Sequence, residues 1–388
     1  MRTRVWSIAL TCILAGGCDR PEPGFCALAD GWEGVSRSLP DETPRPSNRP
    51  DIRVDQVGYL PLASKRAVVA DALVADRFQI RDARRGNVVY EGRLSPQKLD
   101  PDSGDLVRTI DFSPLTVEGE YAIEIEGIDR SASFRIGEAA YREAFETVMA
   151  GFYGQRCGCA VDLGPRFPGL AHPPCHLQDA DFHVSSGREG RRDASGGWHD
   201  AGDYGKYTVV SAFTASLMLW TWEWYSARIA PVRLDIPESE NEVPDFLDEV
   251  KWGLDWMLSM QDDDGGVWHK LSGLRFDGFV MPQVNEKRPR YIIGTNRSPY
   301  KTTAATADYA ATLAIASRVF ARWRPREARD YLVRANKAFE WAISHPDVAF
   351  IQPSDVRTGV YPDENLADEL LWAAAELFCT TGEPAFNQ

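Results

Sequence analysis

The sequence predicts a multidomain protein in which an all-β sandwich precedes an all-α domain. Three observations support this prediction. The chain has 388 residues, which is enough for about two domains of ordinary size. Apolar residues alternate with period two from Asp51 to about Gly137, and after Gly137 they recur with helical spacing. We therefore expect a sandwich over residues 51–137 and a second domain over residues 138–388.

Pro, Gly and Asp residues divide the first block into short alternating runs. Seven such runs within about 90 residues are typical of an immunoglobulin-like β-sandwich. The block contains no His and no Cys, so we expect it to support the second domain rather than to carry chemistry. The expected strands are Ile52–Leu60, Arg66–Ala72, Arg77–Arg81, Val88–Leu94, Leu106–Phe112, Tyr121–Glu126 and Ala132–Ile136.

The second block contains segments whose apolar residues recur three and four positions apart, as in Val209, Phe213 and Leu217. Because no strand pattern separates these segments, we expect an all-α layer and exclude Rossmann and TIM-barrel folds. Two long loops, 154–204 and 262–301, join the helices, and loops of that length usually carry the functional site. Helices are expected at about 139–153, 205–228, 243–261, 302–323, 326–344 and 366–381.

The composition is that of an ordinary globular protein, with 44% hydrophobic and 26% charged residues. The formal net charge is -14. An acidic surface repels phosphate backbones and anionic lipid headgroups, so nucleic acid and polybasic membrane docking are excluded as partners. No stretch after the N-terminal segment is apolar and long enough to span a membrane. We expect a monomer.

The first 18 residues have the features of an export signal. Arg2 and Arg4 precede an apolar run from Val5 to Leu14, which is too short to span a bilayer. The residues before Cys18 (LAGGC) resemble the cleavage box of bacterial lipoproteins. We expect export from a bacterial cell, with the protein secreted, periplasmic or lipid-anchored through Cys18. Residues 19–50 are rich in Pro and are expected to form a linker.

Cysteine and histidine residues are concentrated in the loop 154–204. Three of the seven Cys and four of the six His lie between residues 157 and 199. Thiolates with imidazoles favour tetrahedral zinc, and four protein ligands would make the site structural. A disulfide between Cys157 and Cys175 is the alternative in an exported protein. Composition does not select the ligands among Cys157, Cys159, Cys175, His172, His176, His183 and His199.

The same loop ends in the sequence GGWHDAGDYGKY, residues 196–207. Its two carboxylates, Asp200 and Asp203, lie three residues apart among glycines, which allow sharp turns and close approach to a substrate. Helix capping is the alternative role for such aspartates. Trp198, Tyr204 and Tyr207 offer flat apolar faces beside them. Aromatic faces with paired carboxylates suit a neutral sugar, which needs stacking for position and a carboxylate to activate water.

The GGWHDAGDYGKY sequence resembles the signature of glycoside hydrolase family 9, whose members are mostly endo-β-1,4-glucanases. The resemblance runs from about residue 51 to the last residue, and its opening is similar to the immunoglobulin-like domain of one branch of the family. The further family-like segments are Asp51–Leu60 (DIRVDQVGYL), Gly151–Gly158 (GFYGQRCG), Gly265–Lys270 (GGVWHK), Phe279–Pro282 (FVMP), Ala304–Ala311 (AATADYAA) and Asp368–Gly382 (DELLWAAAELFCTTG).

The resemblance implies an (α/α)6 barrel and inverting hydrolysis of β-1,4-glucosidic bonds in cellulose or related β-glucans. It implies that Asp203 is the general base and that Asp200 helps to hold the attacking water. In this branch two Cys and two His bind zinc, and the match gives Cys157, Cys175, His176 and His199. The metal would then fix the loop that carries the carboxylates.

Calcium sites are also frequent in the family, and residues 358–363 (TGVYPD) with Asp368 resemble one. Thr358, Asp363 and Asp368 would supply the oxygen ligands that calcium prefers. A loop followed by an acidic first helix turn is the alternative. We interpret Asp262–Gly266 (DDDGG) as a turn rather than as a ligand set.

The sequence departs from the family in its last part. Six helices are expected where the barrel has twelve, so we expect about half of the barrel and a C-terminally truncated chain. The family's general-acid Glu and the His/Arg motif before it have no counterpart, so the acid is expected to be missing. Two other functions are therefore considered: an exo-acting glycosidase on short oligosaccharides, including amino sugars, and a glycan-binding fragment without turnover. A purely structural cell-surface protein leaves the Asp pair and the Cys/His cluster unexplained.

Overall fold

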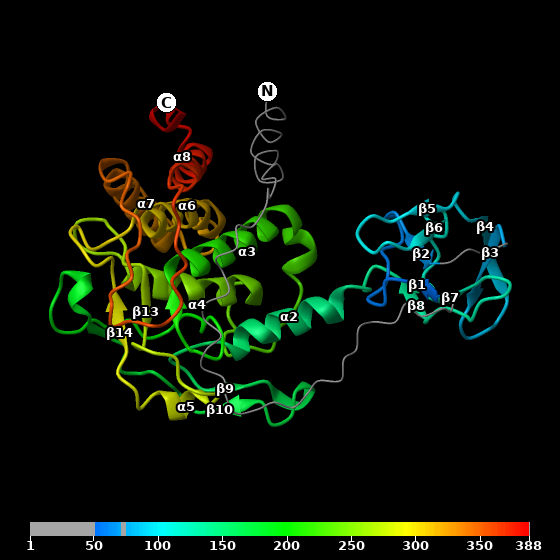
Figure 1. The fold of residues 1–388 in the computed structure, drawn as a ribbon, viewed down its shortest axis with the longest axis horizontal. Coiled ribbons are helices and arrows are strands. Elements are labelled where there is room, and N and C mark those ends of the chain that lie inside the picture. The colour runs from blue at the N-terminus through cyan, green and yellow to red at the C-terminus, as the bar shows by residue number, and fades with distance from the viewer. Residues whose placement is uncertain (1–50, 71–74, 388) are drawn as a thin grey trace. The chain divides into compact units, whose positions relative to one another are not determined.

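The computed structural model describes residues 51–70 and 75–387 (Figure 1). The expected signal (residues 1–18, with Cys18) and linker (19–50) lie outside these residues. The described chain forms two compact units. Residues 51–56 and 61–136 belong to the first, and residues 57–60 and those from 137 onward belong to the second.

The first unit consists of two four-stranded antiparallel sheets, in strand orders β1-β2-β6-β5 and β4-β3-β7-β8. Alternate residues of β2 and β3 are buried, as expected when one face of each sheet covers a core. The rings of Phe112 and Phe134 lie 5.3 Å apart in that core. The strands are β1 Asp51–Arg53, β2 Arg66–Ala70, β3 Arg77–Asp82, β4 Val88–Arg93, β5 Lys98–Leu99, β6 Leu106–Asp111, β7 Gly119–Glu124 and β8 Phe134–Ile136.

The predicted sandwich is thus observed, with two differences in its strands. The run Ile52–Leu60 was expected as one strand, but strand structure ends at Arg53 and residues 57–60 belong to the second unit. Strand β5 was not predicted, because two residues show no alternation.

The second unit contains all six predicted helices and one additional short helix, α5. All six begin within three residues of the expected position, and α3 begins only at Thr208 because residues 206 and 207 form a strand. The helices are α2 Arg142–Gly154, α3 Thr208–Ile229, α4 Asp245–Ser259, α5 Pro282–Asn285, α6 Thr303–Phe320, α7 Pro325–Ser344 and α8 Ala367–Thr381. Short 3₁₀ segments are η1 Gly164–Arg166, η2 Val184–Ser186 and η3 Pro384–Asn387.

Helix α6 forms the centre of this unit and packs against α3, α7 and α8 (Figure 1). Nearly all of its residues are buried. Alanine and threonine dominate its sequence, and their small side chains let neighbouring helices approach closely on several sides. Among the described helices, none has both the length and the apolar composition that crossing a bilayer needs.

The expectation of a second domain without strands is wrong. Four short strands form a sheet in the order β11-β14-β13-β12, and they come from three separate loop regions. A smaller hairpin pairs β9 with β10. Runs of two or three residues are too short to show the period-two alternation that predicts a strand. The strands are β9 Val161–Asp162, β10 Ala171–His172, β11 Asp181–Phe182, β12 Lys206–Tyr207, β13 Lys270–Ser272 and β14 Tyr291–Ile293.

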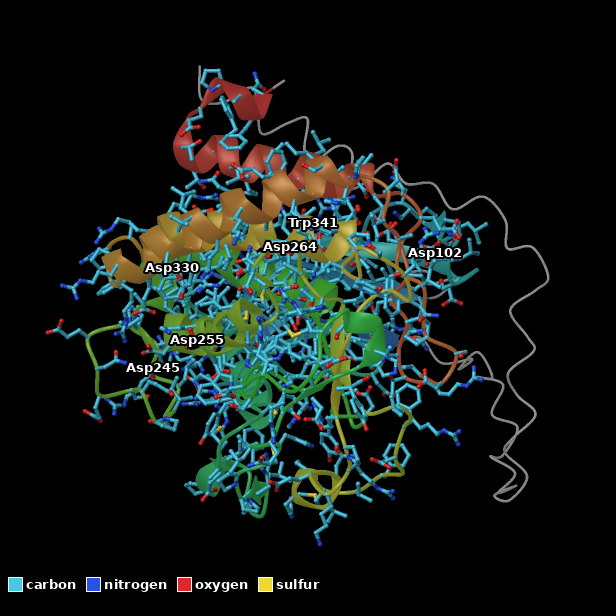
Figure 2. The ribbon with its side chains drawn as sticks, turned by 90° about the vertical axis from the view of Figure 1, so that its left-hand side faces the viewer. Asp102, Asp245, Asp255, Asp264, Asp330 and Trp341 are labelled. Atoms are coloured by element: carbon cyan, nitrogen blue, oxygen red, sulfur yellow. The ribbon has the colours of Figure 1, made fainter. Side chains whose placement is uncertain are left out.

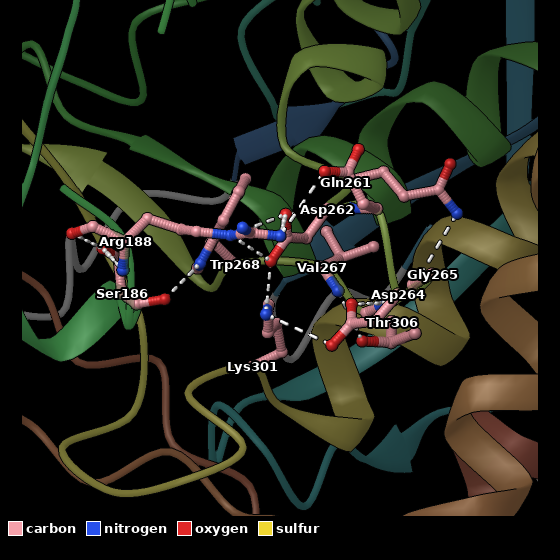
Figure 3. Close-up of polar contacts among 12 residues, drawn as sticks. Ser186, Arg188, Gln261, Asp262, Asp264, Gly265, Val267, Trp268, Lys301 and Thr306 are labelled. Carbon is pink, nitrogen blue, oxygen red and sulfur yellow. Dashed lines mark hydrogen bonds and ion pairs between the residues drawn. The ribbon is translucent and has the colours of Figure 1, made fainter. Parts of the chain in front are cut away.

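The acidic segment Asp262–Gly266 is a turn, as predicted, closed by a hydrogen bond from the Gly265 N–H to the Asp262 carbonyl (3.0 Å). The fully buried Asp262 carboxylate is paired with Arg188 (2.7 Å) and with Lys301 (Figure 3). Two cations thus satisfy this carboxylate, and the turn has no need of a metal. Trp341 of α7, labelled in Figure 2, packs against Gly266 of the turn.

Candidate active site

The two aspartates lie on one tight turn between His199 and β12. The Asp200 N–H donates to the Gly205 carbonyl (2.8 Å), which closes the turn. Tyr204 within it has a φ of 55°, a conformation that few non-glycine residues adopt. Residue 197, before the turn, must be glycine for two reasons. Its φ of 72° is unfavourable for other residues, and a Cβ atom there would lie 2.7 Å from Trp256. This local backbone places both carboxylates on the same side of the loop.

A buried tyrosine holds Asp203. The Tyr207 hydroxyl donates to Asp203 Oδ2 (2.7 Å) and accepts the Gly359 N–H (3.1 Å). Burial and the Asp203 carboxylate raise the pKa of Tyr207 far above its usual value, so the phenol keeps its proton. Asp203 Oδ1 is shielded from solvent and has no hydrogen-bond partner among the described residues. One oxygen is therefore fixed and the other remains an acceptor.

A second tyrosine holds Asp200. The Tyr361 hydroxyl donates to Asp200 Oδ2 (2.8 Å), and its ring packs edge-on against Tyr207 (4.6 Å between centroids). Burial and the Asp203 charge raise the pKa of Asp200, while the Tyr361 bond lowers it. Sequence reasoning missed Tyr361. It lies in the TGVYPD segment, which was interpreted only as a calcium loop.

Replacing Tyr361 by Phe should therefore raise the pKa of Asp200 further, because the carboxylate loses a donated hydrogen bond while its burial remains. If the reaction needs ionised Asp200, the acidic limb of its pH–rate profile should move to higher pH. Rates measured across pH 4–8 for both proteins check this. An unchanged acidic limb would show that Tyr361 does not act on Asp200.

Lys270 on β13 fixes the segment that carries Tyr361. Its side chain is fully buried, and its Nζ donates to Gln352 Oε1 (2.6 Å), the Gly359 carbonyl (2.6 Å) and Thr358 Oγ1 (3.2 Å). Burial lowers the pKa of Lys270 to about 7, against the opposing effect of the Asp203 carboxylate. The sequence offered one signal for it, since it ends the family-like GGVWHK segment.

The same contacts bear on Thr358, one of the three predicted calcium ligands. The Thr358 hydroxyl lies against the Lys270 ammonium group and hydrogen-bonds Ser272 (2.8 Å), so it does not face a cation site. Burial and a hydrogen bond with Asp363 raise the pKa of Glu369 to about 8. Among the described residues, Asp363 and Asp368 do not join any group of three or more Cys, His, Asp or Glu with converging donor atoms. Asp363 lies within hydrogen-bonding range of Glu369, and Asp363 and Asp368 as calcium ligands stay a prediction.

Two of the three predicted sugar-stacking residues, Trp198 and Tyr207, are almost fully buried, yet both line the cavity beside Asp200, and their contact with substrate stays a prediction. Tyr207 is 1% exposed, and its hydroxyl group donates a hydrogen bond to Asp203. Trp198 is 6% exposed, lies against Gly253 of α4 and donates its indole N–H to the buried Glu249 (2.8 Å). Tyr204 is partly exposed and stays a predicted substrate contact. A cavity of about 320 Å³ lies beside Asp200, walled mainly by α2 and α3.

Four buried residues, Cys157, Cys175, His176 and His199, bring their donor atoms within 4.8 Å of one another. His199 Nε2 lies 3.1 Å from His176 Nδ1 and 3.9 Å from Cys175 Sγ. Both cysteines are free thiols, so the alternative disulfide is not formed. The three other candidates, Cys159, His172 and His183, are not in the cluster.

The chemistry of these four donors fits zinc. Burial lowers the pKa of His199 to about 4, which leaves its imidazole neutral and able to ligate. Burial alone would raise the pKa of Cys157. The hydrogen bond between the Cys157 and Cys175 side chains and the positive charge of Lys206 instead lower this pKa well below the usual value. Lys206 Nζ lies 3.6 Å from Cys157 Sγ. A neutral imidazole and a stabilised thiolate are the forms that bind zinc.

The backbone joins the Cys/His cluster to the aspartate turn. The Cys157 N–H donates to the Gly197 carbonyl (2.8 Å), and the His199 N–H donates to the Gln155 carbonyl (2.8 Å). His199 and Asp200 are adjacent in the chain, so the orientation of His199 sets the start of the turn. A metal held by the cluster would thus restrict the loop that carries both carboxylates.

Comparison with known proteins agrees with this arrangement. The model of glycosyl hydrolase family 9 matches residues 141–388, and that of the cellulase N-terminal Ig-like domain matches residues 47–130. The chain belongs to glycosyl hydrolase family 9. The family predicted from the sequence, with its N-terminal immunoglobulin-like domain, is confirmed.

Several family 9 proteins are similar to the chain. Endoglucanase D of Acetivibrio thermocellus is 37% identical over 337 residues, which are 86% of this chain and 52% of that protein. A xyloglucan-specific endo-β-1,4-glucanase of Bacteroides ovatus is 34% identical over 357 residues, 87% of this chain and 58% of that protein. The chain thus spans about half the length of these relatives.

Solved family 9 structures share the fold. The Bacteroides ovatus GH9 structure has a TM-score of 0.76 at 33% identity, covering 87% of this chain and 62% of that one. A Zn-binding triple mutant of GH family 9 endoglucanase J30 has a TM-score of 0.76 at 36% identity, covering 84% and 61%.

Proposed function

We propose that this family 9 protein hydrolyses β-1,4-glucosidic bonds in cellulose or related β-glucans with inversion at the anomeric carbon. The observation that carries the proposal is the pair of aspartates on one turn, each fixed through one oxygen by its own tyrosine. The similarity to endoglucanases supports the substrate class. We also propose that the protein acts as a monomer after export from a bacterial cell, as a secreted, periplasmic or lipid-anchored protein.

In the proposed reaction Asp203 is the general base. Tyr207 holds its Oδ2, so Oδ1 accepts a proton from the attacking water as the water's oxygen bonds to the anomeric carbon. Asp200 orients the same water through its free oxygen. An inverting reaction also needs an acid roughly 6.5–9.5 Å from the base to protonate the leaving oxygen, and we assign no residue of this chain to that role.

We propose that Cys157, Cys175, His176 and His199 hold a structural zinc ion. The ion would supply rigidity rather than chemistry, because four protein ligands fill its tetrahedral coordination. A restricted loop keeps Asp200 and Asp203 in place before substrate arrives, which reduces the entropy cost of binding.

The proposed activity predicts that the chain lowers the viscosity of carboxymethyl-cellulose faster than it releases reducing ends, as internal cleavage requires. Nuclear magnetic resonance should detect the α-anomer first, because inversion of a β-bond gives it. A single small product from cellopentaose would instead show exo action. Calorimetric binding of cellopentaose without any product would show a glycan-binding protein.

A further inference from the structure

We propose that Asn285, at the end of α5, is a positioning residue for the zinc site. It orients His176 toward the metal and ties the segment 277–285 to the loop that carries the aspartates. This inference rests on the proposed zinc site and concerns a residue outside the four ligands.

The hydrogen bonds at His176 assign the role of each ring nitrogen. Its Nδ1 lies 3.1 Å from His199 Nε2, inside the cluster of ligand atoms. Its Nε2 lies 2.9 Å from Asn285 Oδ1, on the opposite side of the ring. A neutral imidazole that ligates through Nδ1 carries its proton on Nε2. His176 therefore donates to Asn285 Oδ1, and this bond fixes both the tautomer and the ring orientation.

The other end of the Asn285 amide confirms its orientation. Asn285 Nδ2 donates to Asp277 Oδ2 (2.5 Å). A carboxylate accepts hydrogen bonds only, so the NH₂ group of the amide must face Asp277 and its oxygen must face His176. Asp277 in turn pairs with Arg288 (3.5 Å). Asn285 is only 5% exposed, and hydrogen bonds shielded from water in this way are costly to break.

The segment 277–285 has a second attachment to the cluster. The Tyr204 ring packs against the rings of His199 (4.9 Å between centroids) and His176 (5.8 Å). Its hydroxyl donates to the Val280 carbonyl. Zinc would therefore hold two loops, the one with Asp200 and Asp203 and the one with α5. Phe279, which is fully exposed, directly precedes Val280 and lies next to Gly202.

Zinc affinity of the full chain tests this role, measured by competition with a chromophoric chelator. Asn285→Leu removes the acceptor and should weaken zinc binding by about 10–100-fold, the usual loss for a partner of a metal-bound histidine. Asn285→Asp keeps an oxygen that accepts from Nε2–H, so its affinity should stay near that of the wild type. Val284→Ala, on the exposed side of the same helix, is the matched control and should bind zinc normally.

The variants separate orientation of His176 from packing. Asn285→Asp loses the bond to Asp277 and places two carboxylates together, so a merely structural role predicts that it binds zinc as poorly as Asn285→Leu. That result would overturn the inference, as would normal affinity in Asn285→Leu. Should Asn285→Leu fail to fold, Asn285→Ala supplies the variant without an acceptor. The absorption spectrum of bound Co²⁺ should change in Asn285→Leu or Asn285→Ala and not in Val284→Ala.

The test also distinguishes this inference from the proposals on which it rests. A wild-type chain that binds no zinc overturns the zinc site and this role of Asn285 together. Zinc binding that is normal in the wild type and weakened in Asn285→Leu supports the role of Asn285 whether or not the chain hydrolyses glucan.

Discussion

Asp203→Asn should lower the rate of β-glucan hydrolysis by about 10²–10⁴-fold, the usual contribution of a positioned general base. An amide oxygen still accepts the Tyr207 hydrogen bond, so the turn should keep its shape. An amide does not take a proton from water near neutral pH, so the rate of the chemical step should fall while folding and substrate binding are kept. Initial rates of reducing-sugar release from carboxymethyl-cellulose measure the effect.

A matched substitution makes this result specific. Asp347 is an exposed aspartate of the same unit, after α7, and Asp347→Asn should leave the rate and the thermal midpoint unchanged. The assignment of Asp203 as base would be wrong if Asp203→Asn retained activity within threefold of the wild type. Binding of cellopentaose to Asp203→Asn should persist, because the substitution removes basicity and not shape.

Removal of zinc is expected to have the largest effect on stability. When the free zinc concentration is a thousandfold above the Kd, zinc binding stabilises the folded chain by about 4 kcal/mol. His199→Ala removes one buried ligand and with it this stabilisation. The thermal midpoint should fall by several degrees, and activity should fall with it because His199 adjoins Asp200. Scanning calorimetry and elemental analysis check this, with about one zinc per wild-type chain expected.

Two further samples support the zinc measurement. Wild-type protein dialysed against a chelator should unfold at nearly the temperature of His199→Ala, since both lack the metal. His172→Ala should keep its zinc, because His172 lies outside the cluster and contacts the Pro173 carbonyl. Zinc-free wild-type protein, purified without chelator, would refute the site.

The helices and strands that could be predicted are those whose apolar residues recur with a regular period. Helix α6 shows why, since most of its eighteen residues have small or apolar side chains, which leave few alternatives to a buried helix. Asp200 and Asp203 could be predicted because they are close in the chain and on one turn. The choice of zinc ligands came from the family resemblance, because composition leaves Cys159, His172 and His183 as equal candidates. His183 in fact hydrogen-bonds Ser185 (2.9 Å) and Asp355 (3.2 Å).

The remainder of the site depends on contacts that no local pattern encodes. Tyr361 reaches Asp200 across 161 residues, and Lys270 reaches Gly359 across 89. The direction of a side chain in an irregular loop is equally hidden. Trp198 and Tyr207 look like a sugar platform beside glycines, yet both are almost fully buried in the wall of the cavity beside Asp200. For an aromatic residue outside a helix or strand, the sequence has no period that would tell whether its side chain is buried or exposed to solvent.

The contact between Tyr361 and Asp200 also sets an order of events during synthesis. Tyr361 follows Asp200 by 161 positions, which take roughly 8 to 32 seconds to translate at the usual 5–20 residues per second. Over that interval the nascent chain carries both aspartates without the tyrosine that fixes one of them. Long-range closure of this kind is slow as well. The turn with Asp200 and Asp203 therefore completes its hydrogen bonds only after Tyr361 has been synthesised.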